Sequence, residues 1–193
     1  MKKIHMVDLQ TQYKFIKTNV DAGIEQVLNS AQFINGPAVK SFQKNLESYL
    51  GVKNVIPCAN GTDALQIAMM GLGLKPGDEV ITADFTYAST VEVIALLGLT
   101  PVLVDVDPIT FNINPESIEK AITKKTKAIV PVHLFGQVAQ MEKIIQIAKK
   151  HSIFIIEDNA QALGANFTYS NGNKVKAGCI GDIGTTSLSL IHI

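Results

Sequence analysis

The stretch Ile153-Phe154-Ile155-Ile156-Glu157-Asp158 places four consecutive apolar residues directly before two acidic ones. An unbroken apolar run of this kind is typical of a strand that is covered on both faces, as in the parallel sheets of α/β proteins. Val102-Leu103-Val104 has the same character. These runs indicate a sheet that lies buried between two layers of helices.

Helical and strand-like patterns alternate along most of the chain. Apolar residues recur at helical spacing over 8–29 and 39–50. The segments that follow predict strands at 54–58, 79–83, 101–106, 128–132 and 153–156, and helices at 62–71, 89–97, after Pro115 and at 141–150. Repeated strand–helix–strand units predict an α/β fold with a mostly parallel sheet, helices on both faces and right-handed crossovers. Asn171-Gly172 predicts the turn of a hairpin.

The composition excludes several classes of function. The chain has 193 residues, 47% of them apolar, which is enough for one buried core. Basic and acidic residues both number 17 and the lysines are scattered, so nothing favours a nucleic-acid partner. No apolar run at the amino terminus predicts a signal peptide, and none approaches the roughly 18 residues of a membrane helix. Cys58 and Cys179 lie far apart without metal-binding spacing, so we expect reduced thiols in a cytoplasmic protein and no metal site.

Polar or aromatic residues follow each predicted strand. In open α/β sheets, ligands bind beyond the carboxyl ends of the strands, so these positions are the candidates for a site. They are 59–63, 84–87, 105–107, 133–136 and 157–161. Five such segments are more than a purely structural α/β domain needs.

Asn60-Gly61-Thr62-Asp63 lies between a predicted strand and a predicted helix. Glycine lets a ligand approach the backbone, and a helix N-terminus presents unpaired N–H groups, so this segment could bind a phosphate. Taken alone, it is more simply explained as an ordinary helix start that is capped by Asn60 or Thr62. It is not a Walker loop, because Gly-x-x-x-x-Gly-Lys is absent.

The acidic pair at the end of the strand needs partners if it is buried, because an unpaired carboxylate is costly to desolvate. A protonated heteroaromatic nitrogen would suit Asp158, since the ion pair keeps that nitrogen charged. The alternative is that Asp158 caps a helix. Tyr87 could stack on a planar ring, or it could be a buried aromatic with a satisfied hydroxyl. We expect His133 to make a structural hydrogen bond.

Seven short motifs occur in the order known from one protein family. They are Phe33-Ile34-Asn35-Gly36-Pro37, Asn60-Gly61-Thr62-Asp63-Ala64-Leu65, Lys75-Pro76-Gly77-Asp78-Glu79-Val80, Asp105-Val106-Asp107, Pro131-Val132-His133-Leu134-Phe135-Gly136-Gln137, Glu157-Asp158-Asn159-Ala160-Gln161-Ala162 and Gly181-Asp182-Ile183-Gly184. From Val7 to Ser187, the chain resembles the DegT/DnrJ/StrS sugar aminotransferases of the fold-type I, aspartate aminotransferase-like class. The resemblance implies that residues 1–187 are the N-terminal part of a large domain that binds pyridoxal 5'-phosphate. It also implies a C-terminal domain that is absent here, and a homodimer with a shared active site.

The resemblance further implies which residues bind the cofactor phosphate. Thr62 and Asp63 match its ligands, and Gly61 gives clearance for the phosphate. Ser187 matches a hydroxyl that also reaches this group.

Other positions match the residues around the pyridine ring of the cofactor. Tyr87 matches the aromatic that stacks on the ring, Asp158 the carboxylate that pairs with the ring nitrogen, and Gln161 the side chain near the ring hydroxyl. Leu163 stands where many relatives carry histidine, so one contact that shapes the substrate site differs.

The implied reaction is transamination. An amino donor, usually glutamate in this family, supplies nitrogen for a keto sugar that is linked to a nucleotide. The motif at 157–164 most resembles enzymes that act on UDP-linked 3-keto sugars for surface polysaccharides.

The end of the chain departs from the family pattern. In relatives, a segment such as Ser-Phe-Phe-Pro-Ser-Lys begins at the position of Ser187, and its lysine holds the cofactor covalently. Here the residues after Ser187 are Leu188-Ser189-Leu190-Ile191-His192-Ile193, with His192 in the register of the lysine. We expect 188–193 to be a divergent, foreign tail, so that no catalytic lysine is present and the fragment is inactive.

Two other hypotheses remain. In one branch of the family a histidine at this position is the base of a keto-sugar dehydratase, and His192 could take that role. Gln161 argues against it, because that branch usually has cysteine there. The other hypothesis is a non-catalytic module that binds the cofactor or a nucleotide sugar.

Overall fold

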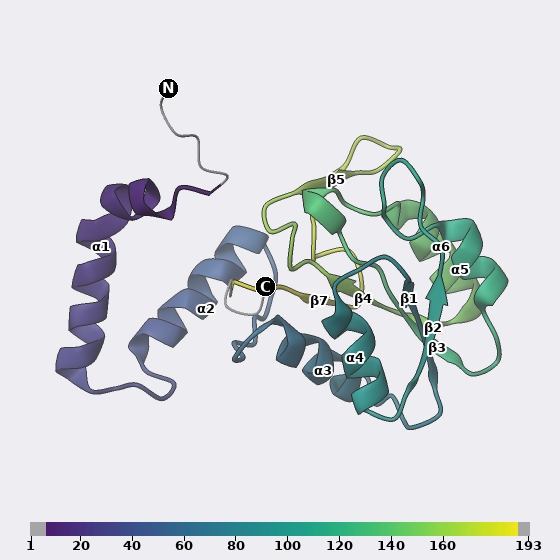
Figure 1. Ribbon diagram of the computed structural model, residues 1–193, viewed down its shortest axis with the longest axis horizontal. Helices are drawn as coiled ribbons and strands as arrows, with labels where there is room; N and C mark the ends of the chain where they lie inside the picture. The colour runs from purple at the N-terminus through teal and green to yellow at the C-terminus, as the bar shows by residue number, and fades with distance from the viewer. Residues whose placement is uncertain (1–6, 189–193) are drawn as a thin grey trace. The chain divides into compact units, whose positions relative to one another are not determined.

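A computed structural model of the chain describes residues 7–188 (Figure 1). The chain divides into two units, which meet in sequence between Pro57 and Cys58. Across the described part of the chain, every helix is too short or too polar to cross a membrane.

The first unit contains two helices, α1 (Leu9–Ser30) and α2 (Pro37–Leu50). Asp8 caps α1, because its Oδ1 accepts the N–H of Thr11 at 3.0 Å. Pro37 occupies the first turn of α2, where its missing N–H costs nothing, and Gly51 ends the helix at a φ of 73°. The two helices predicted from the periodicity at 8–29 and 39–50 are therefore confirmed.

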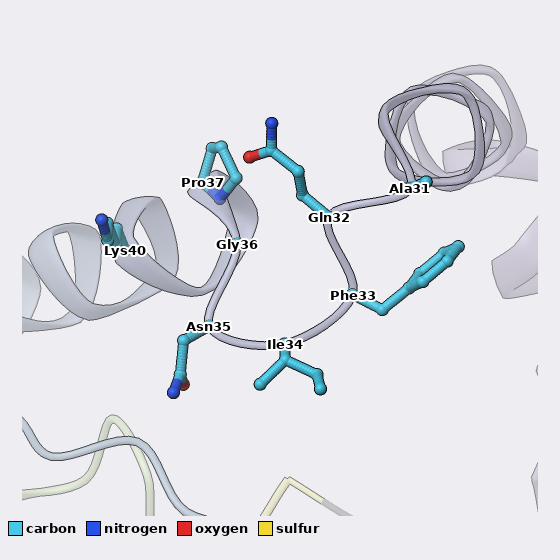
Figure 2. A pocket seen from close by; sticks show the side chains of 8 residues that line it. All are labelled: Ala31, Gln32, Phe33, Ile34, Asn35, Gly36, Pro37 and Lys40. Carbon is cyan, nitrogen blue, oxygen red and sulfur yellow. The ribbon is translucent and has the colours of Figure 1, made fainter.

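The turn between α1 and α2 encloses a hollow of about 380 Å³ (Figure 2). Its lining residues are Ala31, Gln32, Phe33, Ile34, Asn35, Gly36, Pro37 and Lys40. Figure 2 shows Phe33 and Ile34 pointing outward from the turn, and they are 61% and 90% exposed. A Cβ atom at Gly36 would lie 2.2 Å from the carbonyl oxygen of Gln32, so this turn requires glycine at that position.

The second unit is built on a five-stranded parallel sheet in the order β2-β1-β3-β4-β7. The strands are β1 (Glu79–Ala83), β2 (Thr100–Val104), β3 (Thr126–Val130), β4 (Phe154–Asp158) and β7 (Ile183–Thr185). The helices are α3 (Gly61–Gly71), α4 (Ala88–Leu96), α5 (Pro115–Ala121), the 3₁₀ turn η1 (Leu134–Gly136) and α6 (Met141–His151). The predicted parallel α/β architecture is confirmed.

Two apolar clusters cover the two faces of this sheet. Figure 1 shows α3 and α4 on one side of the sheet and α5 and α6 on the other. In β4, Ile155 packs with α5 and α6, whereas the next residue, Ile156, packs with α3 and α4. Successive side chains of a strand point to opposite faces, so both faces must be apolar when both are covered.

Three details of the chain test the prediction further. The expected strand at 54–58 is wrong: the N–H of Val55 donates to Oε1 of Glu47 at 3.0 Å, and Pro57 has no N–H to give to a ladder. Strand β7 was not predicted, because three residues that include a glycine show no strand periodicity. The hairpin at Asn171-Gly172 is confirmed, between β5 (Asn166–Thr168) and β6 (Lys174–Lys176).

Glu157, near the end of β4, is fully buried and has its charge satisfied by four donors. Oε1 accepts the N–H groups of Ile180 at 2.5 Å and Gly181 at 2.6 Å. Oε2 accepts the N–H of Gly178 at 3.0 Å and lies 2.8 Å from Nε2 of His133. One carboxylate therefore holds the loop that leads into β7.

His133 is oriented by a second hydrogen bond. Its Nδ1 accepts the N–H of Ala139 at 3.3 Å, so the ring proton is on Nε2, which donates to Glu157. The ring is 0% exposed. The structural hydrogen bond that was predicted for His133 is confirmed.

Replacing Glu157 with glutamine should destabilise the second unit. Glutamine offers one acceptor oxygen in place of two, so about two buried donors would lose their acceptor, at about 1–3 kcal/mol each. We expect Glu157→Gln to lower the free energy of unfolding in urea by at least about 2 kcal/mol.

The matched control is Glu142→Gln. Glu142 also accepts a backbone N–H and a hydroxyl, both from Ser170, but it does so at the surface, where water can replace the bonds. Its expected loss is below about 1 kcal/mol. If both variants lost the same free energy of unfolding, the burial of the Glu157 carboxylate would not make its hydrogen bonds more important for stability than those of Glu142.

Candidate functional site

The residues that the sequence singled out gather at the carboxyl edge of the sheet in the second unit. Asp158 is the last residue of β4 and pairs with Thr185 of β7, two positions before Ser187. Helix α3 lies against both strands, and α4 lies against α3 and β1. The start of each helix is therefore brought to the same edge.

The start of α3 is capped and also keeps donors for an anion. Asn60 Oδ1 accepts the N–H of Asp63 at 2.9 Å, and its amide donates to the Asp63 carboxylate at 3.2 Å. Within the described residues, the N–H groups of Gly61 and Thr62 have no acceptor. The two interpretations of this segment, cap and phosphate site, are therefore compatible, and Gly61 and Thr62 offer the available donors.

Gly61 and Ser187 are in close contact. A Cβ atom on Gly61 would lie 2.7 Å from the Cβ of Ser187 and 3.2 Å from its Oγ. Only glycine lets the segment that follows β7 approach α3 this closely. The helix N–H groups and the hydroxyls of Thr62 and Ser187 are all donors, which fits a phosphate group. The Asp63 carboxylate is engaged by Asn60.

Asp158 is 5% exposed, and each carboxylate oxygen has one partner. Oδ2 accepts the hydroxyl of Thr90 at 2.8 Å, and Oδ1 accepts the N–H of Ala160 at 3.2 Å. Burial raises the pKa of Asp158, while the bonds from Thr90 and Ala160 and the nearby His133 act in the opposite direction. The alternative that Asp158 caps a helix is wrong, because no helix follows it in the described chain.

Tyr87 and Gln161 frame the same edge. Tyr87 directly precedes α4 and is 48% exposed, so the alternative of a buried aromatic is wrong. Gln161 Oε1 accepts the N–H of Phe135 at 2.8 Å, which ties the loop after β4 to the loop after β3. No hydrogen bond in residues 7–188 joins Gln161 to Asp158 or Ser187.

The sequence did not single out two features of this edge. One is Thr90; α4 also contains the polar residues Ser89 and Glu92, so no local pattern distinguished this hydroxyl. The other is an aromatic cluster of Phe85, Phe111 and Phe135, with ring centroids 5.4 Å and 6.5 Å apart. Phe111 and Phe135 have φ values of 58° and 55°, a strained region for residues other than glycine.

The raised pKa of Asp158 makes a prediction about stability. A carboxyl group whose folded pKa exceeds its unfolded value contributes stability at low pH that is lost as the pH rises through the folded pKa. Asp158→Asn carries no charge and avoids this loss. We expect the variant to unfold at higher urea than the wild type at neutral pH, and the difference to shrink as the pH falls toward 3.8, the ordinary pKa of aspartate.

Asp107→Asn provides a control of opposite sign. Hydrogen bonds from the N–H groups of Thr110 and Ile109 lower the pKa of Asp107, so its contribution is present at neutral pH and lost as the pH falls. This variant should be less stable than the wild type at neutral pH. If Asp158→Asn were also less stable than the wild type at neutral pH, burial would not be the main influence on the pKa of Asp158.

Comparison with known proteins identifies relatives over most of the chain. UDP-2-acetamido-2-deoxy-3-oxo-D-glucuronate aminotransferase of Pseudomonas aeruginosa is 52% identical over 164 residues, which are 85% of this chain and 46% of the relative. A crystal structure of a DegT DnrJ EryC1 StrS aminotransferase from Brucella abortus aligns with a TM-score of 0.89 and 42% identity, covering 95% of this chain and 50% of that one. The chain thus spans about half the length of these relatives.

A third relative has its cofactor in place. The structure of NtdA from Bacillus subtilis, with bound cofactor PMP, aligns with a TM-score of 0.81 and 36% identity over 85% of this chain and 38% of that one. The family model described as the DegT/DnrJ/EryC1/StrS aminotransferase family matches residues 14–191. By sequence and by fold, this chain belongs to the DegT/DnrJ/EryC1/StrS aminotransferase family.

Proposed function

We propose that residues 1–187 are the first part of a transaminase that uses pyridoxal 5'-phosphate to convert a nucleotide-linked keto sugar to an amino sugar. The observation that supports the proposal most is the buried Asp158 carboxylate at the end of β4. The neighbouring strand, β7, leads to Ser187, which lies against Gly61. A carboxylate for a ring nitrogen and a set of donors for a phosphate are the two things that a phosphorylated pyridine needs.

The residues of this chain would act by binding and orienting. Pyridoxal phosphate, when bound, supplies the electron sink for amino transfer. The Asp158 carboxylate would keep a proton on the ring nitrogen, and its burial keeps competing water away. The N–H groups of Gly61 and Thr62 and the hydroxyl of Ser187 would hold the phosphate. Tyr87 would lie against the ring.

Asp63 and Gln161 complete the proposed set. Asp63 would act at the phosphate end, where its bonds to Asn60 hold the start of α3 in place. Gln161 would lie near the ring hydroxyl, and its bond to Phe135 restricts the side chain. A restricted side chain loses less entropy when it binds a ligand.

We further propose a UDP-linked 3-keto sugar as the substrate, glutamate as the amino donor and surface polysaccharide synthesis as the purpose. The sugar is supported by the Pseudomonas relative, whose name specifies a UDP-linked 3-oxo sugar. The donor, the homodimer with its shared active site and the cytoplasmic location rest on the family resemblance and the composition. His192 lies outside the described residues. We propose that the active enzyme needs a lysine in this register to hold the cofactor covalently.

Cofactor binding tests the phosphate site. Gly61→Ala would push Ser187 away, because its new Cβ would lie 2.7 Å from that of Ser187. We expect titration calorimetry with pyridoxal phosphate to show binding to the wild-type chain and at least about tenfold weaker binding to the variant, a loss of roughly 1.4 kcal/mol.

Gly71→Ala is the matched control, at the other end of the same helix. A Cβ atom there meets nothing within 4 Å, so affinity should be unchanged and stability slightly raised. Equal affinities in the two variants would rule out the Gly61–Ser187 contact as the phosphate site. A wild-type chain that gives no heat with pyridoxal phosphate would rule it out as well.

A covalent test concerns the end of the chain. We expect His192→Lys, incubated with pyridoxal phosphate and borohydride, to carry the reduced cofactor on the peptide that contains position 192, as located by mass spectrometry after digestion. Labelling of the chain's other lysines is common to the variants and the wild type, so only this peptide is compared. Leu190→Lys, which is out of register, is the control and should retain much less. If both lysine variants retained the cofactor equally, the family register of His192 would be wrong.

A further inference from the structure

Thr90 is a fully buried residue of α4, and its hydroxyl has one partner. One turn further along the helix, Val93 and Ile94 are buried in the apolar core. A hydroxyl in such a place is costly unless it is hydrogen-bonded. Valine has the same shape without the hydroxyl, so packing alone does not explain a threonine here. The hydrogen bond from the Thr90 hydroxyl to Asp158 explains it.

The hydroxyl does not serve its own helix. Buried threonines in helices commonly donate to a carbonyl one turn earlier. The Thr90 hydroxyl instead donates to Asp158, 68 positions away in sequence and on a different element, at 2.8 Å. The bond therefore links the first turn of α4 to the end of β4.

The bond also determines how the carboxylate is presented. Thr90 occupies one lone pair of Oδ2 and the N–H of Ala160 occupies one of Oδ1. Donors on both oxygens, from two different segments, restrict rotation of the carboxylate plane. Each oxygen keeps a further lone pair for another donor.

Two other ionisable groups lie near Asp158. The backbone N–H of His133 donates to the backbone carbonyl of Asp158 at 3.0 Å, but the ring does not reach the Asp158 carboxylate, because its Nε2 is bonded to Glu157. The Glu157 carboxylate is in turn occupied by three backbone N–H groups. Thr90 is therefore the one side chain that hydrogen-bonds to the Asp158 carboxylate among residues 7–188.

We propose that Thr90 is a positioning residue for the reaction: it orients the Asp158 carboxylate and keeps it ionised for the ring nitrogen of the bound cofactor. The inference rests on the proposed function of the site. Tyr87 lies one turn before Thr90, and its carbonyl accepts the N–H of Thr90 at 3.2 Å. The Thr90–Asp158 bond thus sets the spacing between the residue that faces the ring and the carboxylate that meets the ring nitrogen.

The first test needs no cofactor. The pKa of Asp158 is measured by NMR on the ¹³C-labelled carboxyl group in the chain and in three variants. Thr90→Val removes the hydroxyl and should raise the pKa of Asp158, because an ionised carboxylate loses a donor. Thr90→Ser keeps the hydroxyl and should restore the wild-type pKa. Thr82→Val is the control, since Thr82 is equally buried but donates to the carbonyl of Val130 at 2.9 Å.

An unchanged pKa of Asp158 in Thr90→Val would overturn the inference, and so would a pKa that rises as much in Thr82→Val. If Thr90→Val does not fold, Thr90→Ala gives the same comparison without a branched side chain. A purely structural role for Thr90 would lower stability in these variants without moving the pKa of Asp158.

The second test uses pyridoxal phosphate and the same proteins. Thr90→Val should bind it about tenfold more weakly than the wild type, while Thr90→Ser and Thr82→Val should bind it as the wild type does. Binding by the wild type with no loss in Thr90→Val would overturn the positioning role. No binding by any of the proteins would overturn the proposed cofactor and the positioning role with it, while the pKa measurement would still decide whether Thr90 controls the Asp158 carboxylate.

Discussion

The buried carboxylate of Glu157 is the constraint on which the rest of the site depends. A charge with no exposure to water must have its lone pairs filled, and Glu157 achieves this with His133 and the backbone N–H groups of Gly178, Ile180 and Gly181. Those bonds shape the loop before β7. Because β7 pairs with β4 and ends two residues before Ser187, the same carboxylate determines where that hydroxyl lies.

Glu157 and Asp158 are neighbours in sequence but have opposite roles. Successive residues of β4 face opposite sides of the sheet, so Glu157 follows the face of Ile155 and Asp158 the face of Ile156. Glu157 is surrounded by donors from its own fold. Asp158 has one hydroxyl and one N–H, and its burial raises its pKa, so at neutral pH it costs stability. A carboxylate that is held but incompletely satisfied is suited to receive a positively charged partner.

Sequence patterns predicted most of the second unit because both faces of its sheet are covered. Apolar runs and helical periodicity directly reflect that burial, so β1 to β4 and α3 to α6 were expected at nearly their observed positions. The prediction was wrong where the apolar pattern of a segment and its pairing with other strands do not agree. Residues 54–58 look like a strand but form no ladder, and β7 is a strand only because β4 lies beside it.

The α/β class, the family and most of the residues at the carboxyl edge of the sheet follow from the amino-acid sequence alone, because they depend on local periodicity and on the order of short motifs. Which groups meet at that edge depends on the tertiary structure. Three contacts join distant segments at that edge, between 24 and 126 positions apart in sequence. They are the contact of Gly61 with Ser187, the bond of Glu157 with His133 and the bond of Asp158 with Thr90. No pattern within one segment reports them, since they arise from the parallel alignment of strands that places distant chain segments at one edge.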